Sequence, residues 1–256
     1  GRKGAQKAHT HQLDQHNLEA LKSLLPEPAL EIVKANAAPG ATRALADPAL
    51  HLGDFPFEVL VRQRLLLRVP RPEVRCACGA DADNAHANVC PSVPGGPRIQ
   101  RHNHVLSAIE AWAKRPGFAV VAEPRVSSTS GERLDLSIAA AGGTFATDVV
   151  ITFPGRARSA QQNPLQQAHA AKKRKRGDWA AATGTTFAPV SLESTGGLHK
   201  ESFHWLLAVA GAAHFPFSTR TAFDELLSCI ARALHEGNAY VFEAVRANWA
   251  RRLLSP

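Results

Sequence analysis

The segment from residue 71 to residue 98 constrains the fold of this chain most, because its composition prevents regular structure. Prolines and glycines crowd its second half, so the segment needs some means of staying folded other than a helix or a strand. It also holds three of the four cysteines of the chain, together with one histidine, in a Cys-x-Cys-x7-His-x3-Cys spacing. The four candidate ligands are Cys76, Cys78, His86 and Cys90.

Three thiolates and one imidazole form the ligand set of a closed tetrahedral zinc site. Four protein ligands leave no position for a catalytic water, so we expect a structural Zn²⁺. The alternative is a chance cluster of reduced thiols, because Cys-x-Cys is less typical of zinc sites than Cys-x-x-Cys. The remaining cysteine, Cys229, lies in an apolar helical stretch and is expected to be a small buried hydrophobic residue.

The charge balance favours a polyanionic partner. Lys and Arg number 30 against 22 Asp and Glu, which gives a formal charge of +8 and suits nucleic acid. A generically basic soluble protein is the alternative, because net charge does not say where the charges lie. No stretch approaches the roughly 18 to 20 apolar residues of a membrane helix, so we expect no membrane partner and an intracellular chain. Because methionine is absent even at position 1, we also expect a piece of a longer protein.

Hydrophobic periodicity predicts four regions and an α/β core. The regions are an N-terminal helical linker segment (1–70), the zinc-binding module (71–98), a core (99–195) and a C-terminal helical segment (196–256). Within the core, the pattern predicts a helix, three strands, a helix and a strand, an αβββαβ order with a mixed sheet. The expected core elements are the helix 100–114, the strands 118–122, 133–138 and 144–153, the basic helix 164–176 and the strand 187–192.

Two carboxylates are expected to meet in this core. Asp135 and Asp148 lie on adjoining strands of a hairpin around Gly142-Gly143, where both could hold Mg²⁺ or Mn²⁺ against a scissile phosphate. Glu123, just beyond the first strand, is a candidate third acid, although a Glu-Pro pair is equally at home in an ordinary turn.

The general pattern of two acids and a lysine places the lysine two residues after the second acid. In this chain that position is Val150. We therefore predict that Lys172, on the following helix, supplies the ammonium that stabilises the reacting phosphate. Its neighbours Lys173, Arg174, Lys175 and Arg176 are expected to contact the DNA backbone. The alternative for the whole run is a solvated charge cluster or a localisation signal.

The tripeptide Arg101-His102-Asn103 begins the first helix of the core and has three interpretations. It could cap the helix, orient a phosphate or bind solvent, and from the residues alone capping is favoured.

Read in order, these motifs resemble the restriction-like endonuclease domain, of the PD-(D/E)xK type, of site-specific non-LTR retrotransposon proteins. The resemblance covers roughly residues 40 to 245, and its specificity lies in the order of the motifs. The matching segments are Phe57 to Leu67, Cys76-x-Cys78-Gly79 with His86 and Cys90, Arg101-His102-Asn103, Glu123-Pro124, Arg133-Leu134-Asp135-Leu136, Asp148, Ala168 to Lys172, and Phe187-Ala188-Pro189-Val190 with Glu193 and Gly196. The chain departs from the family at Leu134, where proline is usual, at Arg176, where an aromatic residue is frequent, and in its tight Cys-x-Cys spacing.

The resemblance implies hydrolysis of a phosphodiester in duplex target DNA, which leaves a 3′ hydroxyl that primes reverse transcription of the element's RNA. It further implies a nuclear protein, an upstream reverse transcriptase region on the same polypeptide, and element RNA as a further candidate partner. For the tripeptide, the resemblance favours nucleic-acid binding as the role of Arg101, His102 and Asn103. Two other functions fit the same residues: a non-catalytic nucleic-acid-binding module of a retroelement, and a resolvase or repair nuclease on the same core.

Overall fold

The computed structural model describes residues 2–47, 50–67, 69, 76, 78, 84–90, 95–126, 131–140, 142–156, 163–213 and 215–253. These residues form a mixed α/β fold, as the hydrophobic pattern predicts. The helices are α1 (Arg2–Leu24), α2 (Glu27–Asn36), α3 (Arg43–Ala46), α4 (Asp54–Arg64), α5 (Asn84–Val89), α6 (Gly96–Lys114), α7 (Pro164–Thr183), α8 (Lys200–Ala212) and α9 (Thr219–Leu253), with a 3-10 turn at Pro154–Arg156. The strands are β1 (Ala119–Ala122), β2 (Leu136–Ala140), β3 (Gly143–Thr147), β4 (Val149–Thr152), β5 (Thr186–Phe187) and β6 (Val190–Glu193).

The strands form a mixed sheet that differs from the expected order in one respect. β1, β2 and β3 are an antiparallel meander, and β5 pairs with β3 in parallel. The single strand predicted for 144–153 is wrong, because it divides at Asp148 into β3 and β4, and β4 pairs in parallel with β6. The strand predicted for 187–192 divides in the same way. The register places Asp148 opposite Pro189, whose nitrogen carries no hydrogen, so the ladder is interrupted there on both strands.

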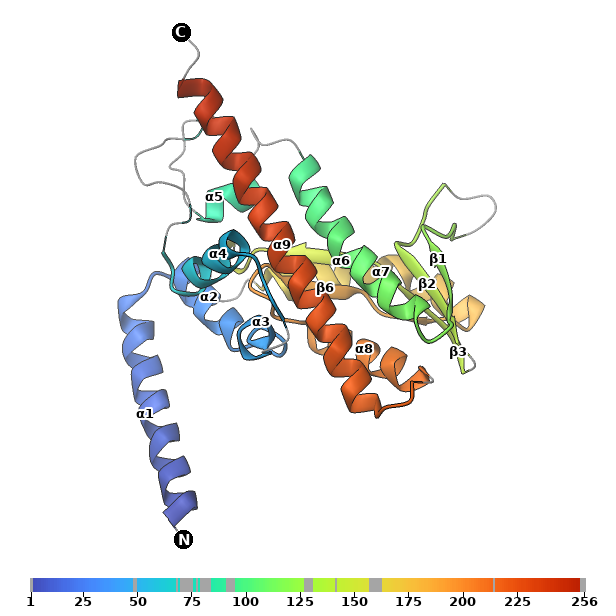
Figure 1. Ribbon diagram of the computed structural model, residues 1–256, viewed down its shortest axis with the longest axis horizontal. Helices are drawn as coiled ribbons and strands as arrows, with labels where there is room; N and C mark the ends of the chain where they lie inside the picture. The colour runs from blue at the N-terminus through green and yellow to red at the C-terminus, as the bar shows by residue number, and fades with distance from the viewer. Residues whose placement is uncertain are drawn as a thin grey trace.

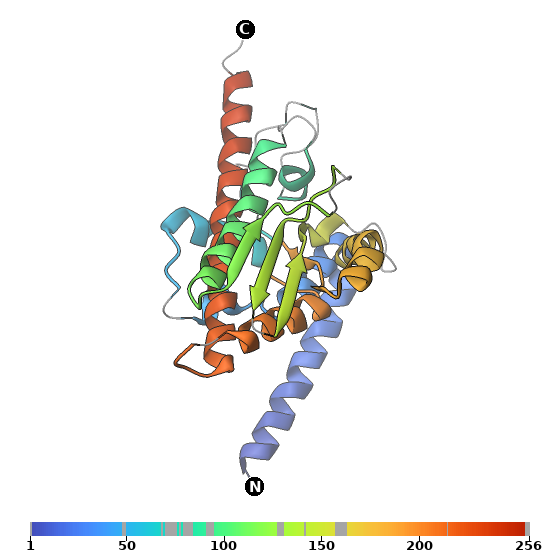
Figure 2. The ribbon, with the colours of Figure 1, turned by 90° about the vertical axis from the view of Figure 1, so that its right-hand side faces the viewer.

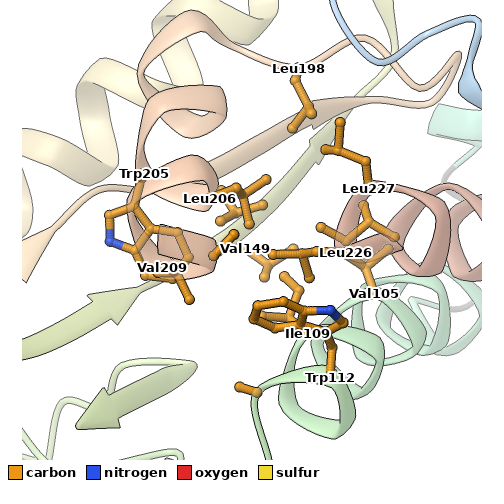
Figure 3. Packing of buried hydrophobic residues seen from close by; sticks show 14 of the residues in the cluster. Val105, Ile109, Trp112, Val149, Leu198, Trp205, Leu206, Val209, Leu226 and Leu227 are labelled. Carbon is orange, nitrogen blue, oxygen red and sulfur yellow. The ribbon is translucent and has the colours of Figure 1, made fainter. Parts of the chain in front are cut away.

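Helices α6 and α8 pack their apolar sides against the strands, and α9 packs on both of these helices. Leu136 and Ile138 of β2 alternate with more exposed residues, and both contribute to this core. Figure 3 shows Trp112 and Ile109 of α6 packed toward Leu226 of α9. Each fully buried side chain of this size contributes about 1.5–3 kcal/mol relative to an exposed one, so this layer fixes the sheet that carries the candidate site.

Helix α7 lies against the other face of the parallel strands. Its residue His169 accepts or donates a hydrogen bond with the Ser191 hydroxyl at 3.0 Å, and Ser191 points away from the face on which its neighbours Val190 and Leu192 join the main core. In Figure 2 the meander faces the viewer, with α6 behind it and α7 beside it.

The N-terminal helices divide into one that projects and three that pack on the core. α1 extends away from the other elements in both views (Figures 1 and 2), whereas α2, α3 and α4 lie beside α9 and the loop after β6. In that loop, Ser194 to Gly197 are buried, and the N–H of Leu198 donates to the carbonyl of Pro39 at 2.9 Å. Residues 27–64 are therefore part of the packed structure. Among the described residues, no helix has the length and hydropathy needed to span a bilayer.

Candidate active site and metal cluster

The structure brings the four predicted cluster residues together. One ligand atom from each of Cys76, Cys78, His86 and Cys90 lies within 4.8 Å of all the others. The Sγ atoms of Cys76 and Cys90 are 3.2 Å apart, and the Cys78 Sγ lies 3.2 Å from Nε2 of His86. Three thiols and an imidazole at this spacing fit a tetrahedral ion with Zn–S bonds of about 2.3 Å, so the cluster could bind zinc.

The cluster is held against the rest of the chain by apolar contacts. Cys76 and Cys90 are buried with Val59 of α4 and with Phe242 and Val245 of α9. Residues 71–75, 77, 79–83 and 91–94 of the predicted zinc module lie outside the described residues. The module thus docks on two helices through the side chains that would also hold the ion.

Asp135 and Asp148 face each other at the end of the β2–β3 hairpin. Leu136 pairs with Thr147, so the next pair in the same register is Asp135 and Asp148. The N–H of Asp135 donates to Oδ1 of Asp148 at 3.1 Å, and the N–H of Val149 donates to Oδ2 of Asp135 at 2.7 Å. These two bonds hold both carboxylates at the point where the third strand of the meander breaks.

Two cations from α7 reach Asp148. Nζ of Lys172 lies 3.2 Å and Nε of Arg176 3.4 Å from the same oxygen, Oδ2. The Asp148 side chain is only 1% exposed and that of Arg176 4%, whereas Lys172 is 35% exposed. Lys172 therefore lies on the solvent side of Asp148, and Arg176 lies on its interior side.

Arg176 lies away from the surface on which it was expected to contact DNA. Its Nη1 pairs with Glu132 at 2.5 Å, and its Nη2 donates to the carbonyl of Arg133 at 2.7 Å. These contacts hold α7 on the hairpin and correct the expected role, because a buried guanidinium with three protein acceptors does not face a backbone phosphate. Its predicted partners in DNA binding, Lys173, Arg174 and Lys175, are exposed.

His102 joins the acid pair, which sequence reasoning did not foresee. Its Nε2 lies 3.0 Å from Oδ2 of Asp135. This hydrogen bond raises the pKa of His102 above its ordinary value, against the opposing effect of burial. Burial pushes the pKa of Asp135 upward, but the hydrogen bonds from His102 and Val149 outweigh it and hold the pKa below its usual value. Asp135 is thus ionised at neutral pH, beside an imidazole that favours its charged form.

The capping interpretation of Arg101-His102-Asn103 is wrong. Helix α6 begins at Gly96, with a proline in its first turn, so the tripeptide lies inside the helix. Arg101 is buried, and only Asn103 and one edge of His102 approach solvent. The spacing of Arg101, Val105, Ile109 and Trp112 already places Arg101 on the buried stripe, which is the sequence signal that could have revealed this.

Glu123 lies near the pair only through its backbone. Its N–H donates to the carbonyl of Asp135 at 3.1 Å, but its exposed carboxylate pairs with Arg133 at 3.3 Å. The residue has a positive φ of 49°, which is uncommon for a residue other than glycine. The structure therefore does not bring Glu123 to the other two acids.

A cleft of about 990 Å³ opens beside the acid pair, between α5, the start of α6, β4 and the start of α7. Arg98, Arg101 and His102 of α6 line one side, and no acidic side chain is among its lining residues in the described part of the chain. The first residues of α7 line the other side, where the helix dipole also favours an anion. The cleft therefore suits a phosphate-bearing ligand.

Comparison with known proteins gives one informative match. No family model matches the chain. The chain is 32% identical, over 260 aligned positions, to the retrotransposable element SLACS 132 kDa protein of Trypanosoma brucei gambiense. The alignment covers 96% of this chain but 22% of that protein, so the chain spans about a fifth of the length of the relative. Over nearly its whole length, the chain is homologous to part of a retrotransposable-element protein.

Proposed function

We propose that the chain is a metal-dependent DNA endonuclease with a PD-(D/E)xK core. The main observation in support is the pair of facing carboxylates, Asp135 and Asp148, with the ammonium of Lys172 at 3.2 Å from Asp148. The helix–strand order around the pair and the homology to a retrotransposable-element protein support the same function.

The donor set at the pair fits Mg²⁺ or Mn²⁺, which are hard cations that bind carboxylate oxygens. The Asp135 side chain is a quarter exposed, so a cation can reach it from solvent. A cation there activates water and neutralises charge on the scissile phosphate. His102 keeps Asp135 ionised and oriented, and Lys172 stabilises the charge that develops on the phosphate.

The proposed substrate is duplex target DNA. The strand to be cut lies in the basic cleft, with Arg98 and His102 beside its phosphates, while exposed Lys173, Arg174 and Lys175 contact the flanking backbone. By the resemblance, the nick leaves a 3′ hydroxyl for target-primed reverse transcription in the nucleus. An upstream reverse transcriptase region then extends it, with element RNA as the template.

A second candidate is a non-catalytic nucleic-acid-binding module, and the burial of Asp148 favours it. Both oxygens of this carboxylate already accept hydrogen bonds, and Arg176 balances its charge without any metal ion. In this case the cleft and the exposed lysines bind nucleic acid, and the acid pair serves only the fold. Metal-dependent cleavage separates the two candidates, whereas salt-sensitive binding is expected of both.

The test is nicking of supercoiled plasmid by the parent chain and by Asp135→Asn, Asp148→Asn and Lys172→Met variants, with and without Mg²⁺. Asparagine keeps the shape of each acid, so Arg176 retains a neutral acceptor. We expect each variant to nick about a hundredfold more slowly or worse, the scale for loss of a preorganised charged group, with DNA binding largely retained. Asp178→Asn, an exposed acid of α7, is the matched control. Absence of nicking by the parent would favour the binding module, and nicking that does not depend on Mg²⁺ would contradict the metal-dependent mechanism.

A further inference from the structure

The first turns of α6 connect the Cys/His cluster to the acid pair. Nη1 of Arg98 donates to the carbonyl of Cys90 at 3.3 Å, and Nη1 of Arg101 donates to Oδ1 of Asn88 at 2.8 Å. Asn88 lies between His86 and Cys90 in the sequence, so both arginines hold the segment that supplies two of the four cluster residues.

Arg101 is the fixed point of this connection. Its guanidinium is buried, and in the described residues its acceptors are two neutral amide oxygens, those of Asn88 and of Asn238 at 2.9 Å. Burial without a carboxylate lowers the pKa of Arg101 to about 10. Asn238 in turn donates to the carbonyl of Ser194 at 2.7 Å, which anchors Arg101 to the loop after β6.

The backbone leaves Arg101 little freedom. A Cβ atom on Gly237 of α9 would approach the Arg101 side chain to 2.8 Å, so α6 and α9 touch closely at this point. A buried cation with this many constraints costs free energy unless each of its acceptors stays in place. Asn88 is the one acceptor that belongs to the cluster-bearing helix α5, and its position depends on how well that short helix is held.

The residue after Arg101 is the hydrogen-bond partner of Asp135. His102 and Arg101 share one helical turn, so a displacement of the first turns of α6 moves the imidazole that holds Oδ2 of Asp135 at 3.0 Å. A continuous path of hydrogen bonds and helix backbone therefore runs from Asn88, through Arg101 and His102, to Asp135.

We propose that the Cys/His cluster and the acid pair are thermodynamically coupled, so that zinc at the cluster strengthens binding of a divalent cation at Asp135 and Asp148. This inference rests on the proposed function, because it assumes a cation site at the acid pair. Zinc would hold α5, and with it Asn88 and the Cys90 carbonyl, in one position. Arg98 and Arg101 bond to these two oxygens, so the first turns of α6, including His102, would be held in position as well. Arg101 is a positioning residue in this account. Coupling of this kind is reciprocal, so a cation at the acids must also retard loss of zinc.

The test measures Mn²⁺ binding by electron paramagnetic resonance on the full chain, before and after zinc is removed with a chelator and again after it is restored. We expect zinc removal to weaken Mn²⁺ binding at least about fivefold, the lower end of typical site-to-site coupling, and zinc to restore it. Zinc release to a colorimetric chelator, followed with and without Mn²⁺, gives the reciprocal readout without any cleavage assay.

Two variants test the path, and a third controls for the loss of an arginine elsewhere on α6. Asn88→Ala and Arg101→Met should weaken Mn²⁺ binding in the zinc-loaded protein and make it insensitive to zinc. Arg115→Met, at the far end of α6 where Arg115 pairs with Glu225 at 2.6 Å, should behave as the parent. Circular dichroism establishes which forms are folded. If the zinc-free chain or Arg101→Met unfolds, zinc-loaded Asn88→Ala still decides the matter.

The outcomes distinguish the two proposals. Equal Mn²⁺ affinity in the zinc-loaded and zinc-free parent, or unchanged affinity in zinc-loaded Asn88→Ala, would overturn the coupling and leave the endonuclease proposal standing. Failure of the zinc-loaded parent to bind Mn²⁺ in a manner that depends on Asp135 would overturn both.

Discussion

At the scale of single residues, the burial of Asp148 decides how the candidate site is built. A carboxylate with 1% exposure needs compensation, and it receives hydrogen bonds from the backbone of Asp135 and from two cations. The two cations have different surroundings. Lys172 is reachable from solvent, whereas Arg176 also pairs with Glu132 and bonds to a carbonyl, so we assign Lys172 to chemistry and Arg176 to stability.

This assignment predicts unequal effects of removing each cation. Arg176→Met leaves a buried carboxylate and a buried carbonyl short of a donor, so we expect a loss of about 3 kcal/mol in the free energy of unfolding. Lys172→Met removes a partly exposed ion pair and should cost about 1 kcal/mol or less. Urea denaturation of both variants and the parent measures the difference. Equal losses would mean that Arg176 is not the structural partner of Asp148.

At the scale of elements, helix α7 positions most of the candidate chemistry, and its ends are well defined. The Asn163 side chain accepts a hydrogen bond from the N–H of Gln166 at 2.8 Å, Pro164 follows it, and Gly184 closes the helix with a φ of 63°. Inside the helix, the His169 ring stacks on His199 at 3.6 Å between centroids. These contacts hold the first turn of α7 beside the basic cleft.

The N-cap gives a prediction for this element. Asn163→Ala removes the acceptor for the Gln166 N–H and should lower the free energy of unfolding by about 1 kcal/mol. Asn163→Asp is the control, because its carboxylate can accept the same hydrogen bond and complements the helix dipole. Thermal or urea unfolding of the three proteins measures the effect. A loss as large in the aspartate variant would show that the cap is not what stabilises α7.

At the scale of the whole molecule, the N-terminal helices seal a buried polar junction. The loop after β6 is covered by the segment around Pro39, and the ring nitrogens of His235, in α9, have no partner among the described residues. Glu193 lies in the same region. Burial, and secondarily the charge of Glu31, raise the pKa of Glu193 to about 7, so this carboxyl resists ionisation in the folded state.

The raised pKa of Glu193 predicts a pH-dependent stability difference. The unfolded chain ionises Glu193 near pH 4.5 and the folded chain near pH 7, so its contribution to folding is full below pH 4.5 and is lost as the pH rises through 7. Glu193→Gln cannot ionise and should therefore be more stable than the parent at pH 8, by at most about 3 kcal/mol. The advantage should vanish at pH 4.5. Urea denaturation at both pH values measures it, and a difference that does not change with pH would contradict the raised pKa.

Much of the fold and of the cluster follows from local pattern in the sequence. The positions of Cys76, Cys78, His86 and Cys90 are set by short spacing, and the structure gathers them. Apolar periodicity places the helices and the strands of the core, and the Gly142-Gly143 turn fixes the hairpin register that brings Asp135 opposite Asp148. These features depend on residues that are close together in the sequence, so they can be predicted from the sequence alone.

Only the tertiary structure decided what each polar side chain contacts. The break at Asp148 depends on Pro189 from a distant strand, and the burial of Arg101 and Arg176 depends on oxygens from α5, α9 and the hairpin. The pairing of His102 with Asp135 likewise needs α6 and β2 to be docked. The spacing of apolar residues in the sequence indicates which side of a helix or strand is buried. A buried charge, in contrast, is stabilised by particular atoms, and only long-range packing brings those atoms within reach.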